Sequence, residues 1–451
     1  MKTIMSRPNS APEIPSSSKR EHSDIPALVF LFLLPFTYLY EASFIGQLYG
    51  EELVFLFLLP VFWAASKNSL PDVIRWTIRL IALWLVVQIA TDIYNDTYIG
   101  DYLRGWARII FFAIDVYVLA RLLNTERRLL AYALGWAITV VVSSAIGFGD
   151  LALSWKFGVG ISAPNIIAAG LLLFLGVRKY TIPLIALVCF ADAVASLFFN
   201  ARNNAFSLGF SSVLIAVAIF PKIRRWATAV WDFSPIVVVV AGLAVTYLLG
   251  SLYVNAAGAG FFGDAARQKL QEQRTDASDK VFGVLAGGRG EFYSSTAAIV
   301  DSPIVGYGSW ARSAYYYQIY VEAIHAHGTP EQLNEVDSKF YIGEPQIPTH
   351  SFLFGTWVEA GIVGGGFWLF MLWRALGSTR RAIELTSIVD VLVLINVPQF
   401  VWNVFFSPFA GSTRLSASFV LIVLMFDPTW TSMLPKVKSP SMPWIGRSTP
   451  R

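Results

Sequence analysis

Long apolar runs separated by short polar segments cover most of this chain. The runs are about 17 to 25 residues long, which is the length a helix needs to cross roughly 30 Å of hydrocarbon. Only a helix satisfies its own backbone hydrogen bonds inside such a run, so the pattern predicts an all-α, polytopic membrane protein. We expect twelve spans, at residues 26–45, 51–66, 73–92, 104–123, 129–148, 164–178, 181–199, 205–220, 235–253, 352–375, 384–405 and 411–427.

The polar segments divide these spans into two groups. About nine spans (26–253) precede a long polar segment (254–351), and about three (352–427) follow it. The long segment contains three candidate surface helices, at residues 264–282, 291–302 and 329–340, and it is too short for a large independent core. We therefore expect a mostly helical extracytoplasmic cap between spans nine and ten. The ends, 1–25 and 428–451, are predicted to be cytoplasmic tails, and the first is predicted to be disordered.

Composition agrees with a membrane protein. Hydrophobic residues make up 55% of the chain, aromatic residues 15% and charged residues 14%, which is too apolar for an ordinary soluble protein. The formal charge of +4 comes from cations in short loops and forms no continuous basic face, so we expect no nucleic-acid partner. Cys189 is the only cysteine, which excludes an intrachain disulfide.

Lysine and arginine fall mainly in alternate loops, and such loops are cytoplasmic in most membrane proteins. The cationic loops contain Lys67 and Arg75; Arg121, Arg127 and Arg128; Arg178 and Lys179; Lys222, Arg224 and Arg225; and Arg374, Arg380 and Arg381. Both termini are therefore expected in the cytoplasm. The long segment is then expected outside, in the periplasm of a Gram-negative cell.

A few cations lie at the opposite membrane face, where this rule expects few. They are Arg104, Arg108, Arg202, Arg289 and Arg414. The planar fork of arginine suits bidentate pairing with phosphate, so these residues are candidates for a pocket that binds a lipid-linked diphosphate. The alternative is that they reach toward lipid headgroups or pair with carboxylates such as Asp101.

Three of the four histidines lie in or at the end of the long segment. His325 and His327 form an H-x-H pair, but no cysteine or third nearby histidine completes a metal site. His350 directly precedes the tenth predicted span, where an imidazole could act as a general base on a hydroxyl group. We therefore predict no metal and no cofactor, and treat His350 as a catalytic candidate.

Several motifs in this part of the chain resemble those of the O-antigen ligase and polysaccharide polymerase (Wzy-type) superfamily. Arg289 is followed by P-I-V-G-Y-G (303–308), by His350 with Ser351, and by E-A-G-I-V-G (359–364). Upstream, N-A-R-N-N around Arg202 and I-S-A-P-N-I-I-A-A-G (161–170) resemble two earlier family elements, although Ala and Asn replace the expected Ser and Gly beside Arg202. Each motif also has a simpler explanation as a turn or as small-residue helix packing.

The resemblance implies transfer of a glycan from undecaprenyl diphosphate to an acceptor sugar at the outer face of the bacterial inner membrane. The acceptor would be another glycan or lipid A-core, and membrane lipids would surround the protein. The process would be exopolysaccharide, capsule or O-antigen (lipopolysaccharide) biosynthesis. The family's catalytic residues correspond to Arg202, Arg289 and His350. For a polymerase, a chain-length regulator is an additional partner to consider.

The residues suggest how such a transfer would work. Fixed arginines stabilise the charge that develops on the departing diphosphate, so a metal is not required. We expect Arg202 and Arg289 to clamp the diphosphate and His350 to deprotonate the acceptor hydroxyl, with inversion at the sugar. Other candidate substrate-binding residues are Arg104, Arg108, Glu291, Tyr307, Glu359 and Arg414.

Some alternatives remain open at this stage. Tyr307, Trp310 and the run Tyr315, Tyr316 and Tyr317 could stack on sugars, but such aromatic residues also serve as core. A transporter or flippase of lipid-linked glycans is the main rival, although transporters usually contain two similar halves, and none is apparent here. A scaffold protein is a third possibility. The sequence does not separate ligase from polymerase; few basic residues in the long segment favour a polymerase slightly.

Overall fold

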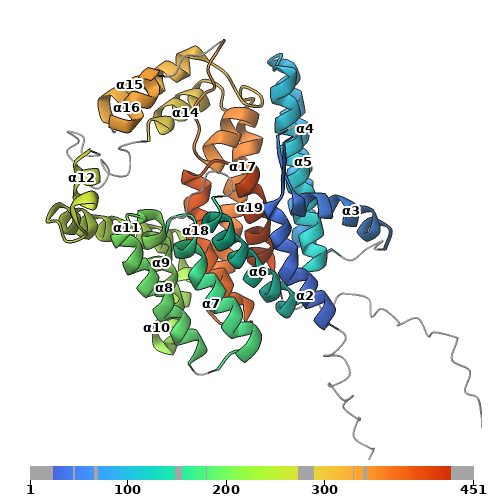
Figure 1. Cartoon of the computed structure of the whole chain (residues 1–451), viewed down its shortest axis with the longest axis vertical. Coiled ribbons are helices and arrows are strands. Elements are labelled where there is room, and N and C mark those ends of the chain that lie inside the picture. Colours follow the sequence, from blue (N-terminus) through green and yellow to red (C-terminus); the bar gives the residue numbers. More distant parts are fainter. Residues whose placement is uncertain are drawn as a thin grey trace, which may run out of the picture.

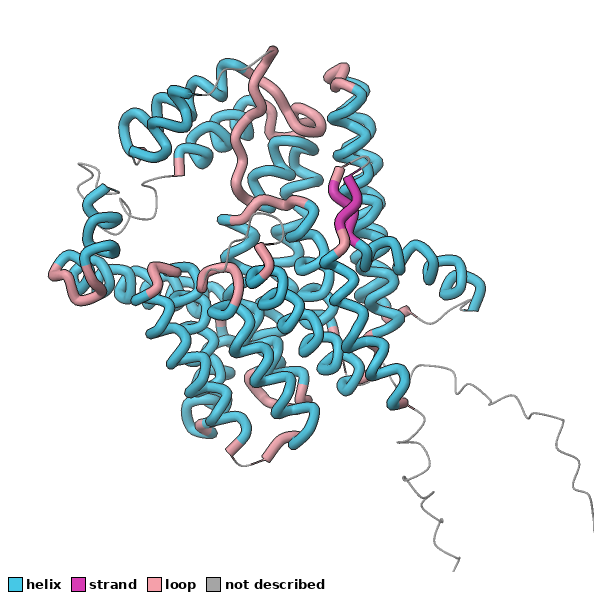
Figure 2. Tube along the Cα trace, viewed as in Figure 1, coloured by secondary structure: helices cyan, strands magenta, loops and turns pink. Residues whose placement is uncertain are grey.

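The structure is a computed structural model of the whole chain, in which residues 24–43, 46–65, 70–147, 155–178, 180–272, 289–328, 330–338 and 343–427 are described. Helices account for most of these residues (Figures 1 and 2). The elements are α2 (Ile25–Leu33), the 3₁₀ helix η1 (Leu34–Leu39), β1 (Glu41–Ser43), β2 (Gln47–Tyr49), α3 (Gly50–Ala65), α4 (Asp72–Tyr94), α5 (Ile99–Leu122), α6 (Glu126–Ala145), α7 (Val159–Leu175), α8 (Thr181–Phe198), α9 (Arg202–Ile219), α10 (Pro221–Phe233), α11 (Pro235–Gly258), α12 (Asp264–Glu272), α14 (Gly290–Asp301), α15 (Ala314–His327), α16 (Pro330–Ser338), α17 (Phe352–Ala382), α18 (Val389–Phe406) and α19 (Gly411–Met425).

Seven helices within the described residues are long and apolar enough to cross a membrane: α4, α6, α8, α9, α11, α17 and α18. Three shorter apolar stretches, Ile25–Leu39, α7 and α19, lie among them. The predicted class, an all-α membrane protein, is therefore supported by the structure, whereas the number of spans stays a prediction. Both predicted tails lie almost wholly outside the described residues.

The region of the first two predicted spans differs from a helical hairpin. α2 ends at Leu33, and the chain continues as η1, which has Pro35 in its first turn. β1 and β2 then form a two-stranded antiparallel hairpin in which Glu41 pairs with Tyr49. Proline cannot donate the backbone hydrogen bond that a continuing helix needs. α3 follows directly and points away from the bundle in Figure 1.

The core of the bundle contains a cluster of aromatic side chains from four elements. Trp84 of α4, Phe112 of α5 and Trp368 of α17 are each 0% exposed. Phe409, in the α18–α19 connection, packs against Phe112 and Trp368 with ring centroids 5.1 and 5.2 Å apart. Large buried rings contribute much of the packing energy of a core. The cluster therefore fixes the α18–α19 connection relative to α5 and α17.

The helices α14, α15 and α16 lie together above the end of α17 (Figure 1). We call them the upper helical group. Its small core contains Ala298, Ala311, Tyr316, Ile347 and Val358. Since Val358 belongs to α17, this core joins the upper helical group to the bundle. The sequence predicted helices at α14 and α16, but it did not predict α15.

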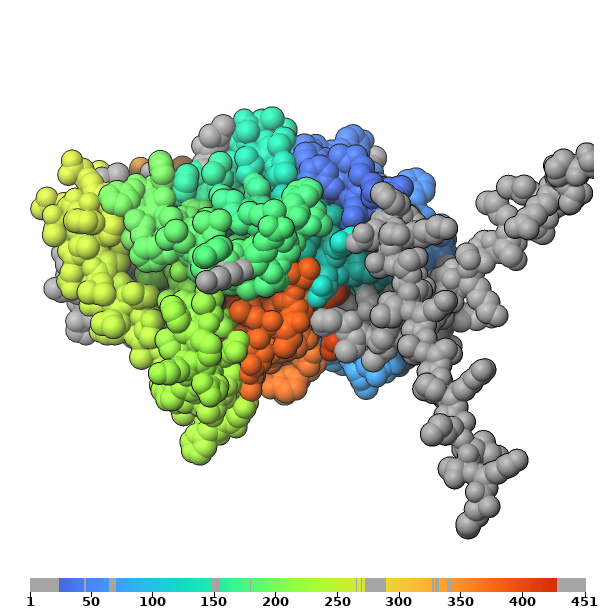
Figure 3. Space-filling model, turned by 90° about the horizontal axis from the view of Figure 1, so that it is seen from below, coloured from blue at the N-terminus to red at the C-terminus, as the bar shows by residue number. Residues whose placement is uncertain are grey.

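α10 and α11 extend the other side of the molecule. Figure 3 shows the yellow-green segment that contains them standing out from its neighbours. Of the residues of α11, only Gly250, Tyr253, Val254 and Ala257 are buried within the protein. An apolar helix with so little protein cover is expected to face lipid. α12 packs on α11 through Leu270 beside Tyr253 and Val254.

Candidate functional site

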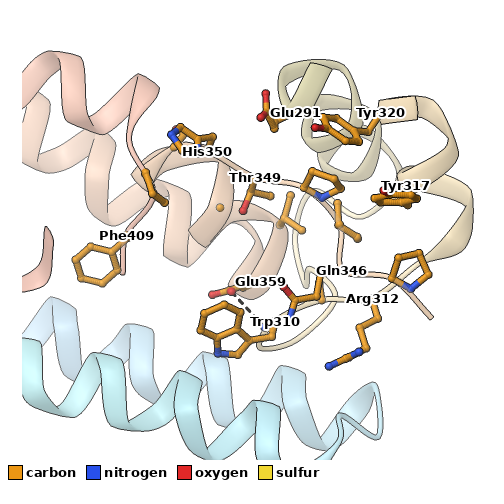
Figure 4. Close-up of a pocket in the computed structure, with 18 of the residues that line it drawn as sticks. Glu291, Trp310, Arg312, Tyr317, Tyr320, Gln346, Thr349, His350, Glu359 and Phe409 are labelled. Carbon is orange, nitrogen blue, oxygen red and sulfur yellow. Dashed lines mark hydrogen bonds between the residues drawn. The ribbon is translucent and has the colours of Figure 1, made fainter. Parts of the chain in front are cut away.

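A pocket of about 560 Å³ lies between the upper helical group and the bundle. One wall consists of two extended segments joined antiparallel, with the N–H of Ile347 donating to the carbonyl of Ala311 at 2.8 Å and that of Ser313 donating to Pro345 at 2.9 Å. The pocket is lined by His350, Glu291, Trp310, Glu359, Gln346 and Phe409, among others (Figure 4). Pockets of this size accommodate small molecules or one end of a larger ligand.

The floor of the pocket depends on a kink in α17. Ala360 and Gly361 leave helical backbone geometry, and Gly361 has a φ of 57°. The loop 303–308 fills the gap: Tyr307 N–H donates to the Val358 carbonyl at 2.8 Å, and Gly308 N–H donates to the Glu359 carbonyl at 3.0 Å. A kink frees carbonyl groups that need new donors. The two motifs at 303–308 and 359–364 therefore form one structural unit.

A buried ion pair connects this unit to α5. Arg108 and Glu359, 9% and 8% exposed, form a salt bridge. Arg108 also donates to the Phe409 carbonyl at 3.3 Å, and Glu359 accepts the backbone N–H of Trp310 at 3.2 Å. Both predicted substrate-binding residues line the pocket, but their charges are directed toward each other. This geometry favours a structural role for the ion pair, which is to hold the pocket wall in position.

The loop beyond Gly308 is held from α4. Asp92 accepts hydrogen bonds from the Ser309 backbone at 2.5 Å, the Ser309 hydroxyl at 2.8 Å and the Trp106 indole at 2.7 Å. Trp310, the next residue, has a φ of 52°. A non-glycine residue in this conformation costs roughly 1–3 kcal/mol and is characteristic of functional sites. The loop thus holds the Trp310 side chain at the pocket wall (Figure 4).

His350 lies at the edge of the pocket, immediately before α17. Ser351 fixes its position, because the Ser351 hydroxyl caps the helix by accepting from Phe354 N–H at 3.0 Å and donates to the Val404 carbonyl at 2.7 Å. The His350 side chain is exposed at the edge of the pocket. Neighbouring protein atoms still exclude part of the water around its ring. This desolvation lowers the pKa of His350, and the positive charges of Arg289 and Lys156 lower it further. The imidazole is therefore neutral at neutral pH and able to accept a proton.

Arg289 and Arg202 approach the same region from other elements. Arg289 precedes α14 and packs over the rings of Phe406 and Trp402, at 4.3 and 5.4 Å from their centroids. Arg202 begins α9 and lies 5.9 Å from the ring centroid of Tyr253. Burial lowers the pKa of Arg289; the charge of Glu291 opposes this and that of Arg202 adds to it. The structure thus places Arg289 within electrostatic range of both Arg202 and His350.

The other candidate residues lie elsewhere. Arg104 is exposed on α5 close to the β1–β2 turn. Arg414 is buried in a salt bridge with Glu52. The Tyr307 hydroxyl lies 2.5 Å from that of Tyr316, which donates to Asp301 at 2.7 Å. These three residues, like Arg202 and Arg289, do not line the pocket. A substrate-binding role for them stays a prediction.

Glu291 lines the pocket on the side of the upper helical group (Figure 4). Burial raises the pKa of its carboxyl group, while its own backbone N–H and the charge of Arg289 act in the opposite direction. Among the described residues, no group of three or more His, Cys, Asp or Glu side chains is arranged to hold a metal ion. His325 is 3.4 Å from Asp337 and is exposed.

Sequence reasoning missed Arg312, which lines the pocket, and Lys156, which acts on His350 from outside it. Arg312 donates to the buried carboxylate of Asp101 at 2.8 Å and to the Glu344 carbonyl at 3.2 Å, which fastens one wall to α5. Lys156 acts electrostatically on His350 from the segment before α7. The sequence signal for Lys156 was its position in a loop predicted to lie on the extracytoplasmic face. Arg312 lies two residues after G-Y-G-S-W (306–310), in the segment also predicted to be extracytoplasmic.

Comparisons of this chain with protein-family models, with curated proteins and with solved structures found no match.

Proposed function

We propose that the protein is a glycosyltransferase that moves a glycan from a polyprenyl diphosphate, such as undecaprenyl diphosphate, to an acceptor sugar hydroxyl. The observation that carries this proposal is the position of His350 at the edge of the pocket, where desolvation and the positive charges of Arg289 and Lys156 lower its pKa. A base beside a group of fixed cations suits a reaction that removes a proton on one side and releases an anion on the other.

In this mechanism, His350 accepts the proton of the acceptor hydroxyl as its oxygen attacks the anomeric carbon. The bond between that carbon and the diphosphate oxygen breaks, and its electron pair leaves with the diphosphate. Arg289 and Arg202 stabilise the growing negative charge, because charge-assisted hydrogen bonds are stronger in a site with little water. Direct displacement of this kind inverts the configuration at the sugar.

The pocket supplies the features that a sugar acceptor requires. The indole N–H of Trp310 has no hydrogen-bond acceptor among the described residues, and Gln346 and Glu291 place polar groups along the same cavity. Carbohydrates combine hydroxyl groups with apolar ring faces, which suits a few polar groups beside aromatic rings. The acceptor would therefore enter the pocket, and the diphosphate would lie beside it at Arg289 and Arg202.

The predicted topology is part of this proposal. Twelve membrane segments with both termini in the cytoplasm would place His350 and the upper helical group at the periplasmic face of a bacterial inner membrane. A lipid-linked diphosphate could then remain in the bilayer while its glycan reaches the pocket. The apolar helices and the distribution of lysine and arginine support this arrangement.

The test is an assay with purified protein in lipid nanodiscs and an undecaprenyl-diphosphate oligosaccharide as donor, followed by mass spectrometry. Extension of the glycan with donor alone would establish a polymerase; transfer only after addition of lipid A-core would establish a ligase. The reaction is run with and without EDTA to determine whether a metal is needed. Movement of intact donor across proteoliposomes without cleavage would contradict the proposal and indicate a flippase.

A further inference from the structure

A second group of charged side chains is buried in the interior between α3, α5 and α19 and does not line the pocket. It contains Glu51, Glu52 and Asp115, each 0% exposed, and Arg414, which is 4% exposed. We call these four residues the buried acid cluster. Three carboxyl groups therefore share one guanidinium group.

Glu52 is the carboxylate best matched to Arg414. Its Oε1 accepts from Arg414 Nε at 2.7 Å and also from Arg414 Nη2. Its Oε2 accepts the backbone N–H of Tyr49 at 2.9 Å. Arg414 makes a further hydrogen bond to the Gln47 carbonyl at 3.3 Å. Glu52 thus has the hydrogen bonds that an ionised carboxylate requires.

Asp115 has no such support. Neither of its carboxyl oxygens has a hydrogen-bond partner within the described part of the chain. The Nε of Arg414 lies 3.9 Å from its Oδ2, beyond hydrogen-bond distance. Glu51 is intermediate: its Oε1 accepts from the Tyr132 hydroxyl at 2.6 Å, but its Oε2 has no partner among the described residues. An ionised carboxylate accepts about four hydrogen bonds when fully solvated.

The charge balance completes the argument. Three ionised carboxylates and one guanidinium would leave two uncompensated negative charges in the interior. Burial strongly disfavours the charged form of a group that lacks partners. We propose that Asp115 and Glu51 form an internal proton-binding site, in which both are neutral acids at neutral pH while Glu52 remains the anion paired with Arg414.

The titratable and charged groups nearest to this site come from several elements. They are Glu51 and Glu52 of α3, Asp115 of α5, Tyr132 of α6 and Arg414 of α19, with Tyr49 of β2, Tyr38 of η1 and Glu41 of β1 in the next layer. Arg414 is the only cation among them. The backbone N–H of Arg414 also donates to the carbonyl of Ala410, which lines the pocket. The site is therefore joined to the pocket wall through the first turn of α19.

Infrared spectroscopy tests the proposal without an activity assay. A protonated carboxyl group has a carbonyl stretch above the amide I band, and this stretch shifts when water is replaced by D₂O. The wild-type protein at neutral pH is expected to show this signal, and Asp115→Asn and Glu51→Gln should each remove part of it. Asp96→Asn is the matched control, because Asp96 is exposed at the α4–α5 turn and its left-handed backbone also accepts asparagine.

Absence of a D₂O-sensitive acid signal in the wild type would overturn the proposal, as would an unchanged signal in both cluster variants. Where Asp115→Asn does not fold, the wild-type Asp115 is observed by ¹³C-aspartate labelling in a background carrying Asp192→Asn and Asp390→Asn. These two substitutions remove other buried aspartates that would contribute to the same signal. An isotope-shifted acid band in that protein supports the site, and its absence contradicts it.

Discussion

The ring of Phe409 packs 5.1 Å from that of Phe112 in the core, and the Phe409 carbonyl accepts a hydrogen bond from Arg108 at the pocket wall. One residue therefore joins the aromatic core of the bundle to the candidate site. Arg108 in turn pairs with Glu359, which holds the Trp310 backbone. The pocket wall is thus fixed by the same residues that pack the bundle, as expected for a preorganised site.

Gly361→Ala should destabilise the protein. A Cβ at this position would lie 1.9 Å from the carbonyl oxygen of Ile304, and the backbone has a φ of 57°. The conformation alone would cost about 1–3 kcal/mol, and the collision would add to it. The melting temperature of each variant is measured by thermal unfolding in the same detergent. Gly366→Ala is the matched control on the same helix, because a Cβ there meets nothing within 4 Å; equal melting temperatures for the two variants would refute the role assigned to the kink.

Removing one partner of the Arg108 and Glu359 pair should lower the free energy of unfolding more than removing both partners. Glu359→Leu leaves a buried guanidinium without its counter-ion, which typically costs about 3–5 kcal/mol. Replacing both residues by apolar ones, in Arg108→Met with Glu359→Leu, is often close to neutral. We expect the double variant to unfold at a higher temperature than Glu359→Leu. Additive losses would show that the two side chains act independently.

The pH dependence of transfer should report the ionisation of His350. The pKa of His350 is lowered, so the ring remains neutral until the pH falls below its usual value of about 6.5. As a general base it acts only when neutral, so kcat/KM should fall on the acid side of that value. Lys156→Gln removes a positive charge that opposes protonation and should move this acid limb to higher pH. Lys156→Arg keeps the charge and should leave the limb in place; no difference between the two would contradict the electrostatic link.

The sequence predicted the features that depend on long patterns. Apolar runs identified the helices that can cross a membrane, and two of the surface helices predicted in the long polar segment correspond to α14 and α16. The β1–β2 hairpin was missed because each strand has only three residues, and Glu41–Ser43 lies at the end of an apolar run that was predicted to be one span. α15 was missed because three consecutive tyrosines, Tyr315, Tyr316 and Tyr317, conceal its helical periodicity.

The candidate site was predictable only in part. Motif order placed His350 and Arg289 in one region, and the structure brings Arg202 within electrostatic range of Arg289. The sequence could not show that Arg108 pairs with Glu359, since 251 positions separate them. Nor could it show that Arg414 pairs with Glu52 across 362 positions. Such pairs depend on which helices become neighbours, and local sequence does not determine that.

The most direct test of the glycosyltransferase proposal is release of undecaprenyl diphosphate from its oligosaccharide conjugate by wild-type and variant proteins in nanodiscs. We expect Arg289→Ala to lower the rate by roughly 10²–10³-fold and His350→Ala to lower it by about 10²–10⁴-fold. Two matched controls, Arg267→Ala and His325→Ala, alter exposed residues of α12 and α15 and should retain activity. Near-normal release by folded Arg289→Ala and His350→Ala proteins would contradict the account.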